Sequence, residues 1–162
     1  KKIEALKYFD GLEKAYSKNL KFLKKIDSER DMVREKWGII NLNSEQADSL
    51  EKKIRVPNKI SNFRKTLTEI FQLIKKKNIN EKKLLTSLNG MNFFRNESNV
   101  LGAINLLQKL KIISPKKNKN WKSLLNDLKK TKVKTSGLKA EQIKDKIFHE
   151  RLKVIQDKKN DL

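Results

Sequence analysis

The sequence contains no cysteine and only one histidine, His149. Without cysteine the chain can form neither a disulfide framework nor a zinc site held by thiolates. A single histidine cannot build a metal site alone, and on a polar helix face it is usually a surface residue. We therefore expect no metal and no cofactor.

Glycine and proline are also scarce, with 5 and 2 residues among 162. The glycines are isolated, and none falls in a GxGxxG or GxxxxGK[ST] phosphate-binding loop. His149-Glu150 is not followed by the second histidine of a zinc protease helix. The acidic residues mostly lie beside lysines at helical spacing, where solvated ion pairs are the expected role. We expect no catalytic residues and no enzymatic activity.

Long hydrophobic runs are absent as well. No apolar stretch approaches the roughly 18 residues of a membrane span, and nothing resembles a signal peptide. The sequence thus favours an intracellular protein, without separating cytoplasm, nucleus and organelle. Hydrophobic residues make up 36%, which suits helices that each bury one narrow stripe. No segment shows sustained alternation with period two. These features predict an all-α fold: an amphipathic helical extension or hairpin (1–57), a basic helical domain (58–156) and a frayed tail (157–162).

Acidic residues are few, at 19 against 40 basic ones, and the net charge is +21. An AT-rich genome explains lysine in place of arginine, but glutamate codons are AT-rich too, so the imbalance needs another cause. The net charge is +4 over residues 1–58, +15 over 59–137 and +2 over 138–162. Such a concentrated basic surface attracts polyanions and speeds their association.

The N-terminal segment has a heptad stripe with alternating spacings of four and three, interrupted by polar Asn19 and Arg30. The stripe indicates a long helix, which Gly38 and the stretch to Asn43 break. It can form a coiled coil with a second chain or pack against later helices of the same chain, and the second interpretation is favoured. The candidate partner-binding residues are Phe9, Leu12, Tyr16, Leu23, Ile26, Val33 and Trp37.

Further along, apolar spacing and capping residues predict a series of shorter helices. A capping box of Asn43 and Gln46 starts a helix with Ala47, Leu50 and Ile54 on one face, which Pro57 ends. The next helix carries an apolar face from Ile60 to Ile74. Later helices start at Asn80 and Ser98, and Gly90 stops the first of these. Ile112, Ile113 and Pro115 are expected to be extended; helices bearing Leu124, Leu125 and Leu128, and then Leu138 to Leu152, follow.

Eight lysines lie between Lys116 and Lys134, opposed only by Asp127. Their self-repulsion favours contact with phosphates. Trp121, within this tract, can stack on an unpaired base or belong to the core with the leucines that follow it, and the core is favoured. Phe93 and Phe94 are likewise expected in the core. The candidate nucleic-acid-binding residues are Lys75, Lys76, Lys77, Lys82, Lys83, Arg95, Asn99, Lys116, Lys117, Lys119, Lys122, Lys129, Lys130, Lys132 and Lys134.

Two family resemblances accompany these patterns. INEKKLLTSL, NGMNFFRNES and NVLGAINLLQKLKII, within residues 78–121, resemble the core of a winged helix, although the turn region is longer than in that family. The resemblance implies that Asn96, Ser98, Asn99, Asn105, Gln108 and Lys109 face a groove, with Lys116, Lys117 and Lys119 in a wing.

Residues 60–155, with LLNDLKKTK and AEQIKDKIFHERLK, are similar in leucine spacing to the N-terminal helical bundle of transcription elongation factor TFIIS. In that family the bundle binds peptide motifs of other transcription proteins.

The leading hypothesis is a basic helical protein that binds DNA or RNA through phosphate contacts, as a subunit of a larger nucleic-acid-associated assembly. With 34 lysines and 6 arginines, backbone contact is favoured over sequence reading. The alternative is a helical interaction module of the transcription or chromatin machinery, binding a protein partner through the heptad helix or the bundle.

Overall fold

A computed structural model of the protein describes residues 22, 33–42, 44–76, 78–134 and 136–162. These residues form α-helices and one short 3-10 helix, with no strand among them, so the predicted all-α class is confirmed there. No helix in this part of the chain is long and apolar enough to cross a membrane. The elements are α2 (Val33–Ile40), α3 (Ala47–Lys53), α4 (Asn58–Lys75), α5 (Glu81–Gly90), α6 (Ser98–Lys109), α7 (Pro115–Lys130), α8 (Ala140–Lys158) and η1 (Lys159–Asp161).

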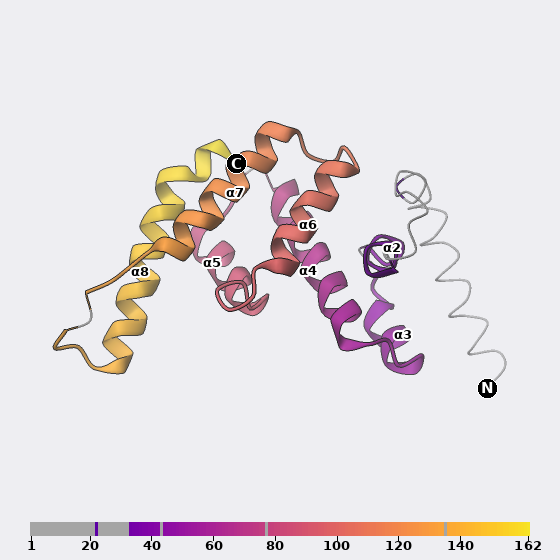
Figure 1. The fold of residues 1–162 in the computed structure, drawn as a ribbon, viewed down its shortest axis with the longest axis horizontal. Helices are drawn as coiled ribbons and strands as arrows, with labels where there is room; N and C mark the ends of the chain where they lie inside the picture. The colour runs from indigo at the N-terminus through magenta and orange to yellow at the C-terminus, as the bar shows by residue number, and fades with distance from the viewer. Residues whose placement is uncertain (1–21, 23–32, 43, 77, 135) are drawn as a thin grey trace.

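Helix α4 lies at the centre, packed against α2 on one side and α6 on the other (Figure 1). Its buried residues recur at spacings of three and four, as the sequence predicted, and include Phe63, Leu67, Ile70 and Ile74. Helix α7 then packs against α6, while α8 packs against both α7 and α5. Helices α5 to α8 therefore form one connected group of packed helices, which α6 joins to α4.

Two glycines let α2 and α6 approach α4 closely. A Cβ atom on Gly38 would lie 3.0 Å from Cδ2 of Leu67, and one on Gly102 would lie 3.3 Å from Cε2 of Phe63. The phenyl ring of Phe63 is fully buried between the two helices that carry these glycines. The helix was predicted to break over the stretch from Gly38 to Asn43, and α2 ends within that stretch, at Ile40. Gly38 itself lies inside α2, where its missing side chain permits the contact with Leu67.

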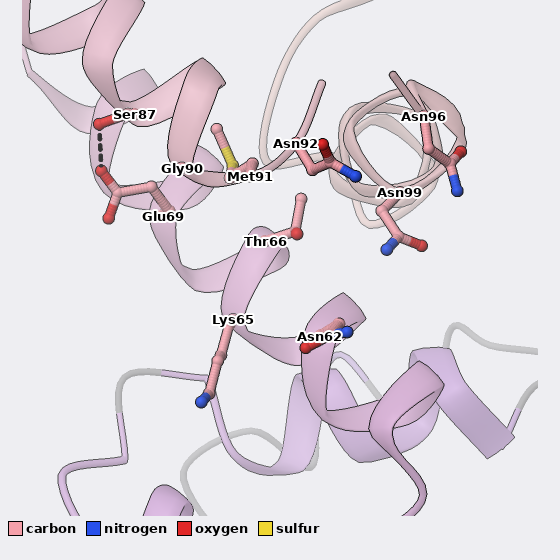
Figure 2. A pocket seen from close by; sticks show the side chains of 10 residues that line it. All are labelled: Asn62, Lys65, Thr66, Glu69, Ser87, Gly90, Met91, Asn92, Asn96 and Asn99. Carbon is pink, nitrogen blue, oxygen red and sulfur yellow. Dashed lines mark hydrogen bonds between the residues drawn. The ribbon is translucent and has the colours of Figure 1, made fainter. Parts of the chain in front are cut away.

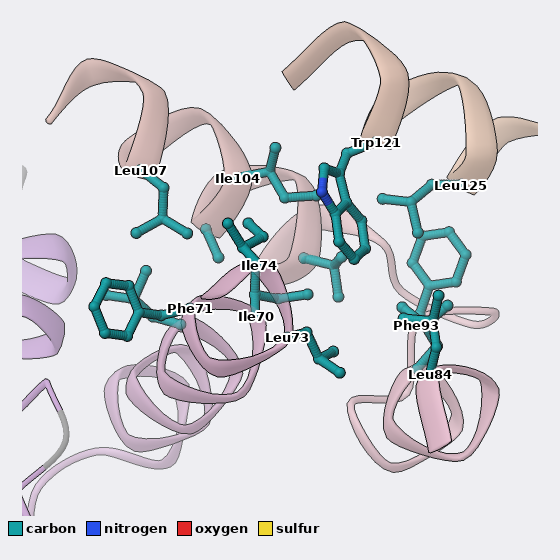
Figure 3. Packing of buried hydrophobic residues seen from close by; sticks show 14 of the residues in the cluster. Ile70, Phe71, Leu73, Ile74, Leu84, Phe93, Ile104, Leu107, Trp121 and Leu125 are labelled. Carbon is teal, nitrogen blue, oxygen red and sulfur yellow. The ribbon is translucent and has the colours of Figure 1, made fainter. Parts of the chain in front are cut away.

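Trp121 is fully buried, which confirms that it belongs to the core. Figure 3 shows its indole between Ile104 of α6 and Leu125 of its own helix, above the C-terminal half of α4. Phe93 is also fully buried. Phe94 is half-buried, and the guanidinium carbon of Arg151 lies 3.4 Å from the centroid of its ring. Neither Trp121 nor Phe93 is therefore placed to stack on a base.

A buried ion pair joins α3 to α4, and a hydrogen bond to the same carboxylate joins α2 to them. Glu51 and Arg64 are 5% and 6% exposed, and two guanidinium nitrogens of Arg64 lie 2.8 Å from the carboxylate oxygens of Glu51. The same carboxylate accepts hydrogen bonds from Trp37 Nε1 at 2.9 Å and from Ser61 Oγ at 2.5 Å. Arg64 also bonds the carboxylate of Asp48. Burial alone would raise the pKa of Glu51, but these hydrogen bonds outweigh it and lower the pKa to about 2.

Of the predicted partner-binding stripe, Phe9, Leu12, Tyr16, Leu23 and Ile26 lie outside the described residues. Trp37 belongs to the buried ion pair network, while Val33 is 59% exposed. The described end of the stripe therefore packs partly within the chain itself.

Helix termini differ from the predictions at the starts of α3 and α7. Of the predicted capping box, Asn43 lies outside the described residues, and Gln46 is the N-cap of α3 without a side-chain hydrogen bond. Ile54, predicted on the apolar face of this helix, follows α3 and is 55% exposed. The expected extended segment to Pro115 is wrong, because Pro115 is the first residue of α7, where its missing N–H costs nothing. Ser114 caps that helix by accepting the Lys117 N–H at 3.1 Å. The tail expected to fray continues α8 to Lys158 and then forms η1.

Candidate nucleic-acid interface

Helix α7 has two faces of opposite character. One face is buried and consists of Asn118, Trp121, Leu124, Leu125 and Leu128. The opposite face is exposed and carries five lysines at helical spacing, and we call it the lysine strip: Lys116, Lys119, Lys122, Lys129 and Lys130. Because Trp121 and the leucines fix the rotation of the helix, the lysines must point to solvent.

The lysine strip runs nearly the full length of α7. Lys116 and Lys129 are 13 residues apart, which corresponds to about 20 Å along a helix axis at 1.5 Å per residue. Asp127 is the one acidic residue of α7, and its carboxylate pairs with Nζ of Lys158. The same ammonium lies 3.0 Å from Ser123 Oγ. The C-terminal end of the chain thus lies beside α7 (Figure 1) and neutralises its one carboxylate.

More basic residues lie near the start of α7, because the last turn of α4 contacts it there. Lys117 Nζ lies 3.5 Å from the carbonyl oxygen of Ile74, in the last turn of α4. Lys76, just after α4, lies close enough to Lys83 of α5 for that ammonium to lower the pKa of Lys76. Lys117 of α7 thus reaches the last turn of α4, and Lys76 and Lys83 are neighbours in space.

Three other lysines predicted to bind nucleic acid lie outside α7. Lys75 is exposed, and its Nζ lies 4.2 Å from the ring centroid of Phe71, so its chain covers the core. Lys82 is exposed on the first turn of α5. Lys77 lies outside the described residues.

At the other end of α7, Lys129 Nζ pairs with Glu97 Oε2 at 2.8 Å. Glu97 precedes α6, so this ion pair joins the end of the lysine strip to the turn before that helix. Arg95 in the turn is exposed, and so are Lys132 and Lys134 in the segment that follows α7. Three chain segments thus bring basic side chains to this end.

Two residues expected to face a groove are used inside the protein instead. The buried amide of Asn118 donates to Gln108 Oε1, and it lies 3.4 Å from Asn105 Oδ1. These bonds join α6 to α7, so Asn105 and Gln108 point toward a neighbouring helix. Lys116, Lys117 and Lys119, expected in a wing, belong to α7.

Sequence reasoning missed a hollow that contains Asn99. It has a volume of about 490 Å³ and opens between α4, the end of α5 and the turn before α6 (Figure 2). We call it the amide hollow, lined by Asn62, Lys65, Thr66, Glu69, Ser87, Gly90, Met91, Asn92, Asn96 and Asn99. No sequence spacing relates Asn62 to the asparagines 30 or more residues later, because only the packing of α4 against α6 brings them together.

Within the described ranges, no group of three or more acidic or histidine side chains is placed to hold a metal ion. No protein-family model, curated protein or solved structure matches this chain.

Proposed function

We propose that the protein binds nucleic acid by contacting phosphates with the lysine strip of α7, as part of a larger nucleic-acid-associated assembly. The observation that carries this proposal is the strip itself: five exposed lysines on one helix face, with the single acid of that helix already paired. Such an arrangement costs self-repulsion, which a polyanion relieves.

The length of the strip fits a nucleic acid strand. Along the axis of duplex DNA each strand carries one phosphate per about 3.4 Å, so the roughly 20 Å from Lys116 to Lys129 equals the axial rise of about six nucleotides. Lysines at both ends of α7 extend the basic surface further. Because ammonium groups act as point charges, they favour contact with the backbone over reading of base edges in a groove.

Fluorescence anisotropy with labelled duplex DNA, single-stranded DNA and structured RNA at about 50 and 200 mM salt tests the proposal. If the strip neutralises about five phosphates, the logarithmic salt slope is about −4.5 for duplex DNA and −3.5 for a single strand. Affinity then falls about 500-fold and about 100-fold, respectively, over this fourfold change in salt. Absence of binding at the lower salt concentration would refute the proposal.

Matched variants assign the binding to the strip. Lys119→Gln, Lys122→Gln and Lys130→Gln remove three exposed strip charges, and the duplex salt slope should fall by about 2.7. Lys52→Gln, Lys59→Gln and Lys139→Gln remove three exposed charges outside α7 and should leave the slope unchanged. Equal losses in the two triple variants would mean that total charge, and not the strip, determines binding.

One observation favours the alternative function, a protein-interaction module. A hollow of about 430 Å³ between α5 and α8 has apolar lining from Leu85, Ile147 and Phe148. Arg151 also lines it, and this guanidinium has no acidic partner among the described residues, while burial lowers its pKa. Light scattering at two protein concentrations tests self-association: a mass that rises in the wild type but not in Phe148→Ala would support this function.

A further inference from the structure

The amide hollow gathers four asparagine side chains, one from α4 and three from the turn between α5 and α6 and the start of α6. Asn62 comes from α4, Asn92 from the turn after α5, Asn96 from the residues before α6, and Asn99 from the first turn of α6. Figure 2 shows them on the α6 side of the hollow around Thr66, with Met91 and the Glu69–Ser87 hydrogen bond toward the other side. Asn92 has a φ of 56°, a left-handed conformation that asparagine tolerates better than most residues.

Most of the hydrogen-bonding capacity of these amides is unused. The side chains of Asn62, Asn92 and Asn99 make no hydrogen bond with the described part of the chain. Asn96 Oδ1 accepts from the backbone N–H of Ser98 at 3.1 Å and from its hydroxyl at 2.7 Å, and its NH2 group stays available as a donor. The hollow therefore offers several donors and acceptors to a bound group.

The lining favours a neutral polar group over a phosphate. Its one cation is Lys65, whose Nζ lies 3.4 Å from Asp48 Oδ1, and the carboxylate of Glu69 lies in the same lining. A nucleobase edge, in contrast, alternates donors and acceptors, and a carboxamide pairs with such an edge through two hydrogen bonds. The half-buried thioether of Met91 adds a polarizable surface for an aromatic ring. The volume is within the range of about 300–1,000 Å³ typical of ligand pockets.

The hollow adjoins the lysine strip. Arg95 lies in the same turn as Asn92 and Asn96, and Glu97, the next residue, pairs with Lys129 at the end of the strip. A strand whose phosphates follow the strip thus reaches the rim of the hollow. Because the hollow is recessed between helices, a base must leave a duplex, or come from a single strand, to enter it.

We propose that the amide hollow binds an unpaired nucleobase of the strand whose phosphates contact the lysine strip, with the asparagine amides bonding the base edge. This inference rests on the proposed function. It makes the protein a binder of single-stranded or unpaired nucleic acid. Since asparagine pairs through two bonds with adenine, adenine is the base expected to bind best.

The test compares a labelled twelve-residue deoxyadenosine oligomer with an abasic phosphodeoxyribose oligomer of the same length. The abasic oligomer keeps every phosphate and has no base to enter the hollow. We expect the wild-type protein to bind the adenine oligomer at least about tenfold more tightly. Asn62→Ala, alone and with Asn99→Ala, should reduce this ratio toward one and leave abasic binding and the salt slope unchanged.

The exposed residues Asn78 and Asn160 provide the matched control, since Asn78→Ala with Asn160→Ala should keep the wild-type ratio. The single Asn62→Ala variant changes an exposed side chain, so it keeps the test valid if the Asn99→Ala variant does not fold. The base site is overturned if the wild-type protein binds both oligomers equally. It is also overturned if both asparagine variants keep the wild-type ratio of adenine to abasic binding. In either case the phosphate interface stands. If neither oligomer binds while duplex DNA does, the base site fails and the phosphate interface stands. If duplex DNA, single-stranded DNA and structured RNA all fail to bind, the proposed function itself fails.

Discussion

The buried ion pair between Glu51 and Arg64 leads to a prediction on stability. In a Glu51→Gln variant the shape of the side chain is kept, but Arg64 loses the charge that compensates its burial. The pKa of Glu51 is lowered from 4.5 to about 2. At about 1.4 kcal/mol per pKa unit, the ionised form contributes up to about 3 kcal/mol to the free energy of unfolding.

The pH dependence gives this contribution a definite sign. A carboxyl group with a lowered folded-state pKa stabilises the fold above its unfolded pKa, near 4.5, and loses this effect as the pH falls toward about 2. Urea unfolding followed by far-UV circular dichroism should therefore show a difference of about 3 kcal/mol between wild type and Glu51→Gln at pH 7. The difference should shrink steadily below about pH 4.5.

Comparison of the two proteins removes the effect of carboxylates outside this ion pair network, which titrate in both. A volume-matched Arg64→Met variant completes a double-mutant cycle, and the double variant should lose much less than the sum of the single losses. The reasoning is refuted if Glu51→Gln costs less than about 1 kcal/mol at pH 7, or if its cost does not change between pH 7 and pH 3.

Two further predictions concern packing. Gly38→Leu should destabilise the protein by about 1–3 kcal/mol, because even a Cβ atom there lies 3.0 Å from Leu67. Gly90→Ala, with open space around its Cβ, should be neutral or stabilising by up to about 1 kcal/mol. Urea unfolding midpoints of the two variants that move in the same direction would contradict this. Trp121→Ala should lower the free energy of unfolding by about 3–5 kcal/mol, because this indole is fully buried. In a Trp37→Phe variant, whose one tryptophan is Trp121, iodide should barely quench the fluorescence. Strong quenching would place Trp121 at the surface.

Local periodicity was sufficient for the central helix. The spacing of Phe63, Leu67, Ile70 and Ile74 predicted an amphipathic helix, and α4 covers that segment from just after Pro57 to Lys75. The same reasoning identified the caps that bond within a few residues: Asn80 accepts the Lys83 N–H at 2.9 Å. Such contacts depend on neighbours in the sequence, which is why they could be predicted.

Two residues have a role that depends on a partner. Gly38 lowers helix propensity, but packing of α2 against α4 rewards its missing side chain. Pro115 ends helices in many sequences, yet it also fits the first position of one, and Ser114 decides between these by capping α7. In both cases the residue type restricts the backbone, and the choice between ending and continuing a helix depends on contacts outside the local pattern.

The two parts of the candidate interface differ in the same way. The lysine strip belongs to one helix, so the charge and spacing of sixteen residues reveal it once Trp121 is assigned to the core. The amide hollow exists only because α4, α6 and the turn between α5 and α6 meet, and asparagines are too common here for one of them to stand out. Phosphate attraction treats all sequences alike, whereas amides distinguish bases. The strip proposed to supply affinity therefore follows from local sequence, while the hollow proposed to supply selectivity consists of residues that only the fold brings together.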